Sequence, residues 1–319
     1  MHESRQLENL IRQPVRTPVH GDEVFEQRVG AAATPVEVPD PDPLAEIAYA
    51  WISQSMTSDA TVTLPVLTDA ARLLSSPADR ITVASRAPVI ALHADHQAAC
   101  LPDLVLLASM LCSTGMHVVV TGARSRGMLP AVGDVFAAMG VPEAGCAAHI
   151  DVAFTRSDPA CVPLKSISPR LDGWLQLPAN DPLHRLARSL APWADPIGVV
   201  ADLRVLITTD ANWAQCVLQV AQALGAHVLT LLVEPATAIA GSAPRMRATL
   251  AARGRITPLT LDGPWSDADR SALTACTDAA SIARRVQSVL AGEFPVPRLT
   301  DQLLELVSRV CGSLRSGLD

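Results

Sequence analysis

Beyond about residue 88, short apolar runs of strand length alternate with segments whose apolar residues recur at helical spacing. The predicted strands are Val89–Leu92, His117–Val120, Asp151–Thr155, Val205–Thr209 and His227–Val233. Helices are predicted between them, and two more helical patterns flank a Gly/Pro-containing break at 292–297. Apolar strands that alternate with helices are typical of a parallel sheet covered on both faces. The sequence therefore predicts a mainly parallel-sheet α/β domain over 85–319.

The first 84 residues have a different pattern and predict a small helical N-terminal domain. Four prolines within 34–43 forbid a helix there and predict an extended linker. Apolar residues at helical spacing then predict one helix over 44–52 and another over 67–74. The expected buried face of the second helix consists of Leu67, Ala70, Leu73 and Leu74. We therefore expect two units, residues 1–84 and 85–319.

The composition of the chain disfavours several classes of protein. No apolar run approaches the roughly 20 residues that cross a bilayer, and the first residues lack the pattern of a secretory signal. The seven cysteines are scattered without a C-x-x-C pair, which argues against a zinc site and against a disulfide framework. We therefore expect a cytoplasmic protein with no membrane partner and no bound metal.

Charge restricts the ways in which this chain could bind nucleic acid. The net charge is −7, and Lys165 is the one lysine of the sequence, so attraction to phosphate depends on local arginine clusters. Arg124 and Arg126 follow a predicted strand and precede a helix, where phosphate commonly binds. Arg185 and Arg188 share a helical turn and could follow a nucleic-acid backbone. The alternative for both pairs is that they are solvated surface arginines.

A second group of polar residues follows the first predicted strand. His93, Asp95 and His96 lie at its carboxyl end, where open α/β sheets usually bind ligands. The pattern H-x-D-H could support acid–base chemistry or hold a metal. A polar loop without a ligand is the alternative.

Three stretches of the sequence resemble motifs of one enzyme family, in the same order. T-G-A-R-S-R-G at 121–127, followed by D-V-F-A-A-M-G at 134–140, resembles K-H-G-N-R and L-x-x-(L/F)-G. Residues 184–196, H-R-L-A-R-S-L-A-P-W-A-D-P, resemble R-T-x-F-N-x-L-G-P-L-x-N-P, and 278–292 resemble a C-terminal helix that ends in L-x-G. Residues 85–319 thus resemble glycosyltransferase family 3, the fold family of anthranilate phosphoribosyltransferase and the pyrimidine nucleoside phosphorylases.

The departures from this family concern its catalytic parts. The enzymes bind pyrophosphate with G-T-G-G-D, whose glycines let backbone N–H groups approach phosphate, but residues 92–96 here contain no glycine. The acidic pair that holds Mg²⁺ falls near 235–238, which has no carboxylate. Gly122 and Arg124 match K-H-G-N-R, whereas the lysine and histidine are replaced by Val120 and Thr121. Because phosphoribosyl transfer relies on Mg²⁺ and cations, we expect no catalytic residue and no cofactor.

One branch of the fold family shares these losses. Residues 163–171, P-L-K-S-I-S-P-R-L, resemble its P-x-x-x-x-x-P-x-L, and residues 184–192 resemble its H-x-L-A-K-x-x-x-P. This YbiB-like branch is dimeric and binds nucleic acid through a basic groove. The resemblance implies a non-catalytic homodimer that binds DNA or RNA. The residues expected to contact phosphate are Arg124, Arg126, Arg185 and Arg188, with Lys165 and Gly122 beside them.

Two alternatives to nucleic-acid binding stay open. One is a glycosyltransferase or phosphoribosyltransferase whose phosphate loop is rebuilt around 93–96, in which case Mg²⁺ would be needed. The other is a scaffold that keeps the fold only to bind a partner protein.

Overall fold

A computed structural model of the chain describes residues 44, 46–48, 64–74, 87–94, 101–122, 130–195, 201–234, 245–261 and 278–316. Within these residues, seven strands form one sheet in the order β3-β2-β1-β4-β5-β6-β7. The strands are β1 (Val89–Ala94), β2 (His117–Gly122), β3 (Ala160–Pro163), β4 (Leu203–Thr208), β5 (Val228–Glu234), β6 (Arg245–Ala252) and β7 (Arg255–Leu259). Strands β1 to β5 are parallel, and β6 and β7 are antiparallel to their neighbours. The predicted α/β class is confirmed.

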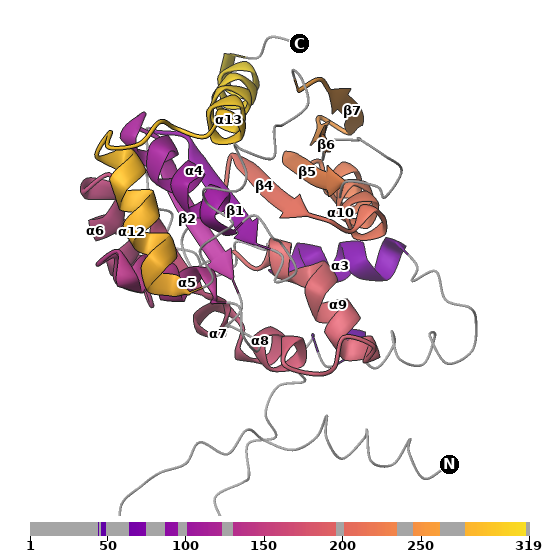
Figure 1. Cartoon of the computed structure of the whole chain (residues 1–319). Helices are drawn as coiled ribbons and strands as arrows, with labels where there is room; N and C mark the ends of the chain where they lie inside the picture. Colours follow the sequence, from indigo (N-terminus) through magenta and orange to yellow (C-terminus); the bar gives the residue numbers. More distant parts are fainter. Residues whose placement is uncertain are drawn as a thin grey trace, which may run out of the picture.

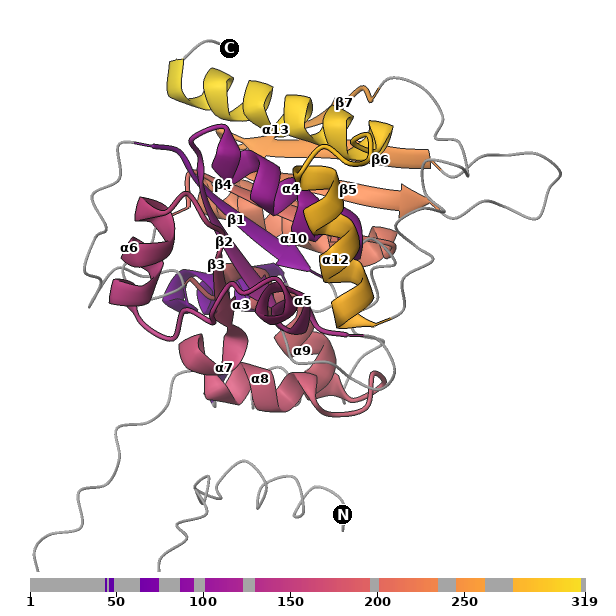
Figure 2. The same cartoon turned by 60° about the vertical axis from the view of Figure 1, so that its left-hand side comes forward.

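One face of the sheet is covered by four helices. They are α4 (Leu101–Ser113), α5 (Val132–Ala138), α12 (Ala279–Leu290) and α13 (Arg298–Ser316). Alternation along the strands turns Val118 and Val120 of β2 toward this face, where they share a core with α4. Helix α13 crosses above β6, and α12 lies beside α4 (Figure 2).

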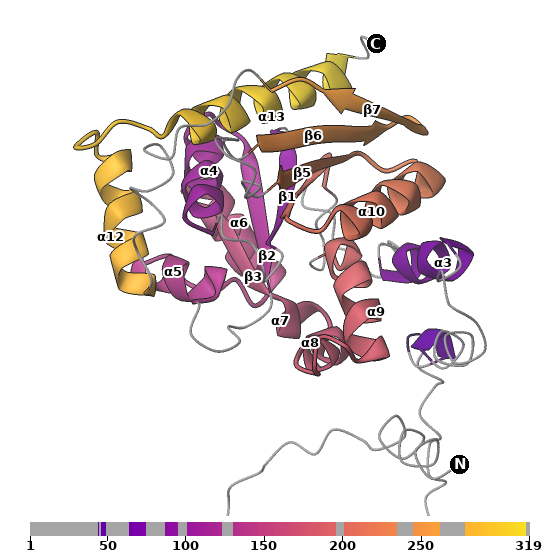
Figure 3. The ribbon, with the colours of Figure 1, turned by 45° about the vertical axis from the view of Figure 1, so that its right-hand side comes forward.

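The opposite face is covered by a second group of helices. They are α3 (Leu64–Leu74), α6 (Ala147–Thr155), α8 (Pro169–Leu175), α9 (Pro182–Leu190), the 3-10 turn η1 (Ala191–Trp193) and α10 (Ala211–Leu224). Leu206 of β4 packs among them, whereas its neighbours Val205 and Ile207 point into the other core. Figure 3 places α4 and α12 on one side of the sheet and α3, α9 and α10 on the other.

The carboxyl ends of the parallel strands face a cluster of short helices. The arrowheads of β1 and β2 point toward α7 (Leu164–Ile167), α8 and α9 (Figure 1). In the sheet, β2 lies on one side of β1, and β4 lies on the other side of β1. In open α/β sheets, ligands bind at this reversal of strand order, outside the carboxyl ends. The topology therefore directs attention to the ends of β1, β2 and β4.

A buried ion pair joins η1 to the sheet. Asp195 follows η1 and accepts two hydrogen bonds from the guanidinium of Arg204 on β4, one of them with an Nη2–Oδ2 distance of 2.6 Å. Arg204 also donates to the Pro192 carbonyl at 3.0 Å and lies over the Trp193 ring. The side chains of Arg204 and Asp195 are only 9% and 3% exposed. Such pairs are tolerated in a core because hydrogen bonds satisfy both charges.

The N-terminal residues that are described pack against the second helical group. Ala48 and the α3 residues Leu67 and Ala70 are buried in the same core as α9 and α10. The predicted linker 34–43 and the boundary at 84/85 lie outside the described residues, so the division into two units stays a prediction. No helix in the described part of the chain is long and apolar enough to cross a membrane.

Two details of the predicted elements are wrong. The segment Asp151–Thr155 is not a strand but the second half of α6, because Ile150 and Phe154, four residues apart, pack together against β2 and β3. The third strand is β3, which begins at residue 160. On α3 the buried face is Leu67, Thr68, Ala70 and Ala71, and Leu73 is half exposed.

Candidate functional site

His93 and Thr121 lie side by side at the carboxyl ends of β1 and β2. They are register partners, and the His93 Nδ1 atom lies 3.2 Å from the Thr121 hydroxyl oxygen. Both side chains are buried. The His93 ring also approaches the Trp213 ring of α10, with 6.3 Å between centroids. His93 is therefore held by its neighbours on the α10 side of the sheet.

Asp210 connects β4 to α10. Its backbone N–H donates to the Thr208 hydroxyl at 3.1 Å. Its Oδ1 atom accepts the Trp213 backbone N–H at 3.0 Å, which caps the helix. A carboxylate at this position also stabilises the helix through the positive end of the helix dipole. Asp210 is thereby fixed two residues beyond the end of β4.

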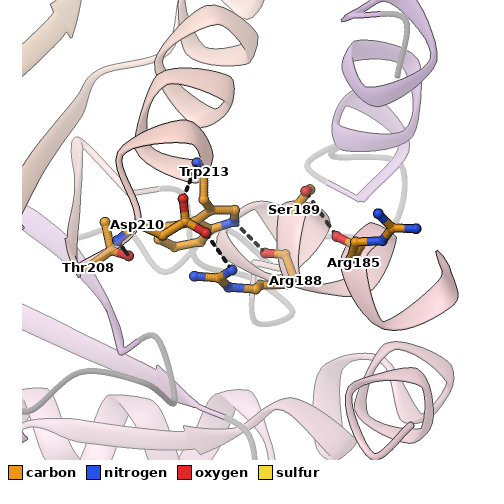
Figure 4. Close-up of polar contacts among 6 residues, drawn as sticks. All are labelled: Arg185, Arg188, Ser189, Thr208, Asp210 and Trp213. Carbon is orange, nitrogen blue, oxygen red and sulfur yellow. Dashed lines mark hydrogen bonds and ion pairs between the residues drawn. The ribbon is translucent and has the colours of Figure 1, made fainter. Parts of the chain in front are cut away.

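Arg188 of α9 completes this corner of the site. Its Nη1 atom donates to Oδ2 of Asp210 at 2.8 Å, and its guanidinium lies 5.1 Å from the centroid of the Trp213 ring. The Trp213 indole N–H donates in return to the Arg188 carbonyl at 3.1 Å. Figure 4 shows the three side chains gathered between α9 and α10. The structure thus brings Arg188 to the carboxyl edge already paired with a carboxylate.

Arg185 belongs to the same helix but points elsewhere. It is exposed, and its guanidinium is directed away from the group formed by Arg188, Asp210 and Trp213 (Figure 4). Its carbonyl accepts the Ser189 hydroxyl at 3.0 Å. The preceding residue, His184, is buried, and its Nδ1 atom lies 3.2 Å from the Leu175 carbonyl oxygen. The two arginines of α9 therefore do not converge on one point.

Lys165 and Gly122 lie on the other flank of β1. Lys165 follows the end of β3 by two residues, and its Nζ atom is 3.6 Å from a carboxylate oxygen of Glu143. Gly122 pairs with Pro163 of β3. A Cβ atom at position 122 would approach a methyl carbon of Val132 to 2.7 Å, so close packing alone requires glycine there. Close approach of phosphate is not needed to explain this residue.

The remaining predicted site residues lie outside the described residues. These are Arg124, Arg126, Asp95 and His96. Within the described residues, no cluster of three or more His, Cys, Asp or Glu side chains could hold a metal ion. Thiolate chemistry near the edge is disfavoured, since burial and then Glu143 raise the pKa of the Cys161 thiol to about 12. What the described site offers is cations paired with carboxylates, together with hydrogen-bonding groups.

Sequence reasoning missed Asp210 as part of the site. Trp213, which Asp210 caps, belongs to the core of α9 and α10, and Arg188 lies over its ring. Asp210 had a readable signal, because an aspartate between a strand and a helix is a typical N-cap. Its pairing with Arg188, 22 residues earlier in the chain, had no such signal.

Comparison with known proteins identifies the fold. Anthranilate phosphoribosyltransferase from Thermus thermophilus aligns over 86% of this chain and 91% of its own, with a TM-score of 0.51 and 17% identity. The Saccharomyces cerevisiae enzyme in complex with phosphoribosyl pyrophosphate and Mg aligns over 88% of this chain and 80% of its own, with a TM-score of 0.55 and 12% identity. No family model matches the sequence, and no curated protein matches it significantly. The chain therefore has an anthranilate phosphoribosyltransferase-like fold.

Proposed function

We propose that this protein binds nucleic acid without catalysis, through phosphate contacts at the carboxyl edge of its sheet. The observation that carries the proposal is the placement of cations. Arg188 from α9 reaches this edge beyond β4, and Lys165 from α7 reaches it beyond β3. Arg124 and Arg126 follow the end of β2 in the sequence. These cations follow or meet the ends of β3, β2 and β4, three of four consecutive strands in the sheet, and cations spread along one edge can contact successive phosphates of one backbone.

The residues that replace the enzymes' phosphate loop support the absence of catalysis. At the end of β1 the side chain of His93 fills the space beside Thr121 and Trp213. A loop that cradles pyrophosphate needs bare backbone N–H groups instead. With no carboxylate at 235–238, the chain also lacks the acidic pair on which Mg²⁺-assisted transfer depends. We further infer a homodimer in the cytoplasm, as the resemblance to the nucleic-acid-binding branch implies.

One observation favours a transferase as the second candidate. His93 lies buried at the carboxyl end of β1, against Thr121, at the reversal of strand order where ligands of such sheets bind. The Saccharomyces cerevisiae neighbour binds phosphoribosyl pyrophosphate and Mg. A rebuilt site around His93 would require Mg²⁺ and would consume phosphoribosyl pyrophosphate, which distinguishes it from the first proposal.

The test is a fluorescence-anisotropy titration of a labelled single-stranded oligonucleotide at low and moderate salt. The variant Arg185→Ala/Arg188→Ala should bind more weakly, and its dependence of log K on log salt should become shallower by about 0.7 for each phosphate that is no longer neutralised. The matched control is Arg255→Ala/Arg284→Ala, which removes the same charge from exposed positions on β7 and α12. The control should bind close to wild type.

Other outcomes would contradict the proposal. Equal weakening by both double variants would mean that net charge alone matters and that the carboxyl edge is not the binding site. Absence of binding at low salt would favour a partner-binding scaffold. Mg²⁺-dependent loss of phosphoribosyl pyrophosphate would favour the transferase.

A further inference from the structure

Nucleic-acid binding does not by itself explain why the α9 arginine at the carboxyl edge is already paired. Arg188 meets this edge just beyond β4, yet its Nη1 atom lies 2.8 Å from an Asp210 oxygen. A carboxylate at this distance offsets much of the attraction that the guanidinium exerts on a phosphate. The edge is therefore a weaker anion site than its arginine content indicates.

Asp210 is fixed in place by bonds that do not involve Arg188. Its other oxygen caps α10 by accepting the Trp213 backbone N–H, and its backbone N–H donates to Thr208. The carboxylate cannot turn away from the edge without uncapping the helix. Any release of Arg188 must come from movement of the arginine.

Arg188 has a second contact that keeps it near the edge when it leaves Asp210. Its guanidinium lies over the Trp213 ring, and the Trp213 indole N–H holds its carbonyl. A planar guanidinium can slide on an aromatic face and retain that attraction. The side chain can thus change its anionic partner without losing its support.

Solvent exposure makes such an exchange feasible. The Arg188 and Asp210 side chains are 15% and 34% exposed. Ion pairs that contact solvent are weak because water and salt screen them. A phosphate that arrives from solvent can replace the carboxylate, whereas the buried pair of Arg204 and Asp195 gives no such access.

We propose that Asp210 competes with phosphate for Arg188 and thereby sets the affinity of the carboxyl edge for nucleic acid. This inference rests on the proposed function, since the competing ligand is a phosphate of a nucleic-acid backbone. In the unbound protein the carboxylate of Asp210 accepts the guanidinium hydrogen bond. On binding, Arg188 donates to phosphate instead, and Asp210 stays behind as the cap of α10. No covalent bond changes.

The test removes the charge of Asp210 and keeps its cap. Asp210→Asn retains an oxygen for the Trp213 N–H, because asparagine caps helices as well as aspartate does. The probe is the labelled single-stranded oligonucleotide at low salt. Asp210→Asn should bind about threefold to fivefold more tightly than wild type, the range expected for an ion pair that is partly exposed to solvent. Asp210→Ser, another neutral cap, should behave in the same way.

The matched control is Asp278→Asn. Asp278 caps α12 by accepting the Ser281 N–H at 2.8 Å, so the substitution removes the same charge from the same kind of position on another helix. It should leave the affinity within about twofold of wild type, because Asp278 is exposed, caps a helix on the other face of the sheet and has its charge screened by water and salt. In the double variant Arg188→Ala/Asp210→Asn, the gain in oligonucleotide affinity should disappear, because that gain depends on Arg188.

The outcomes separate this inference from the proposed function. Tighter binding by Asp210→Asn, with Asp278→Asn close to wild type, supports the competition. If Asp210→Asn and Asp278→Asn both bind the oligonucleotide with the affinity of wild type, the competition is overturned and the proposed function stands. A gain that persists without Arg188 also overturns it. If no variant binds at low salt, both proposals fail.

Discussion

The molecule contains the same three residue types, arginine, aspartate and tryptophan, in two places with opposite surroundings. Arg204 pairs with Asp195 and lies over Trp193 inside the core, close to the start of β4. Arg188 pairs with Asp210 and lies over Trp213 just beyond the end of the same strand. The inner pair has two hydrogen bonds between its charged groups, and the outer pair has one.

Burial rather than residue type decides what each group can do. Within the core, both side chains are almost excluded from water, so each charge depends on the other and the pair acts as a permanent link between η1 and β4. At the edge, solvent can replace either partner, so the pair adds little stability and can exchange. The predictions below test this contrast in stability, from the largest expected effect to the smallest.

The largest effect should follow from breaking the inner pair. Asp195→Ala leaves the Arg204 guanidinium buried without its counter-charge, which should lower the free energy of unfolding by about 3–5 kcal/mol. Urea denaturation followed by circular dichroism measures this loss. Asp151→Ala removes an exposed aspartate from α6 and should change stability by no more than about 0.5 kcal/mol. Similar losses in both variants would mean that the inner pair is not a structural link.

Breaking the outer group should cost less, and the cost should depend on the replacement. Asp210→Ala removes both the ion pair and the cap of α10, so a loss of about 1–2 kcal/mol is expected. Asp210→Asn keeps the cap and should lose less than about 1 kcal/mol. The same urea experiment separates them. If alanine and asparagine cost the same, the cap contributes nothing and the ion pair accounts for the whole effect.

Burial also decides which parts of the fold the sequence predicts. The residues of β4 are buried throughout, and its apolar run Val205–Ile207 is typical of a parallel strand, as predicted. The prediction for 151–155 is wrong because five apolar-rich residues fit either a strand or a helix, and only the packing of Ile150 with Phe154 decides. The hairpin of β6 and β7 was missed because its two-residue turn, Arg253-Gly254 with positive φ at both residues, lacks the Asn-Gly or Asp-Gly pair that usually marks such turns in a sequence.

For the candidate site, the sequence predicted where some residues lie in the fold but not how they pair. His93 lies at the carboxyl end of β1, as its position after an apolar run indicated. The contact between Arg188 and Asp210 depends on how α9 packs against α10, which no local pattern encodes. The role of Gly122 likewise depends on its contact with Val132, the first residue of α5. Long-range packing therefore supplies what sequence patterns could not.

The smallest effect should be local and can be read at Cys216, in the second turn of α10. Burial raises the pKa of this half-buried thiol, so near pH 8 it is protonated and reacts slowly with a maleimide. Asp210→Ala should loosen the first turns of α10 and speed labelling of Cys216 by about fivefold, the rate equivalent of removing a helix cap. Mass spectrometry of peptides assigns the label to each cysteine.

Cys112 is the matched reporter of global unfolding. It is buried in α4, in the opposite core, and burial raises its pKa to about 12. In Asp210→Ala its labelling should stay close to wild type, because only α10 is loosened. In Asp195→Ala, Cys112 and Cys216 should accelerate together, because the whole domain is destabilised. Parallel acceleration of both thiols in Asp210→Ala would instead show that the outer pair supports the entire fold, and the contrast between an exchangeable and a permanent pair would disappear.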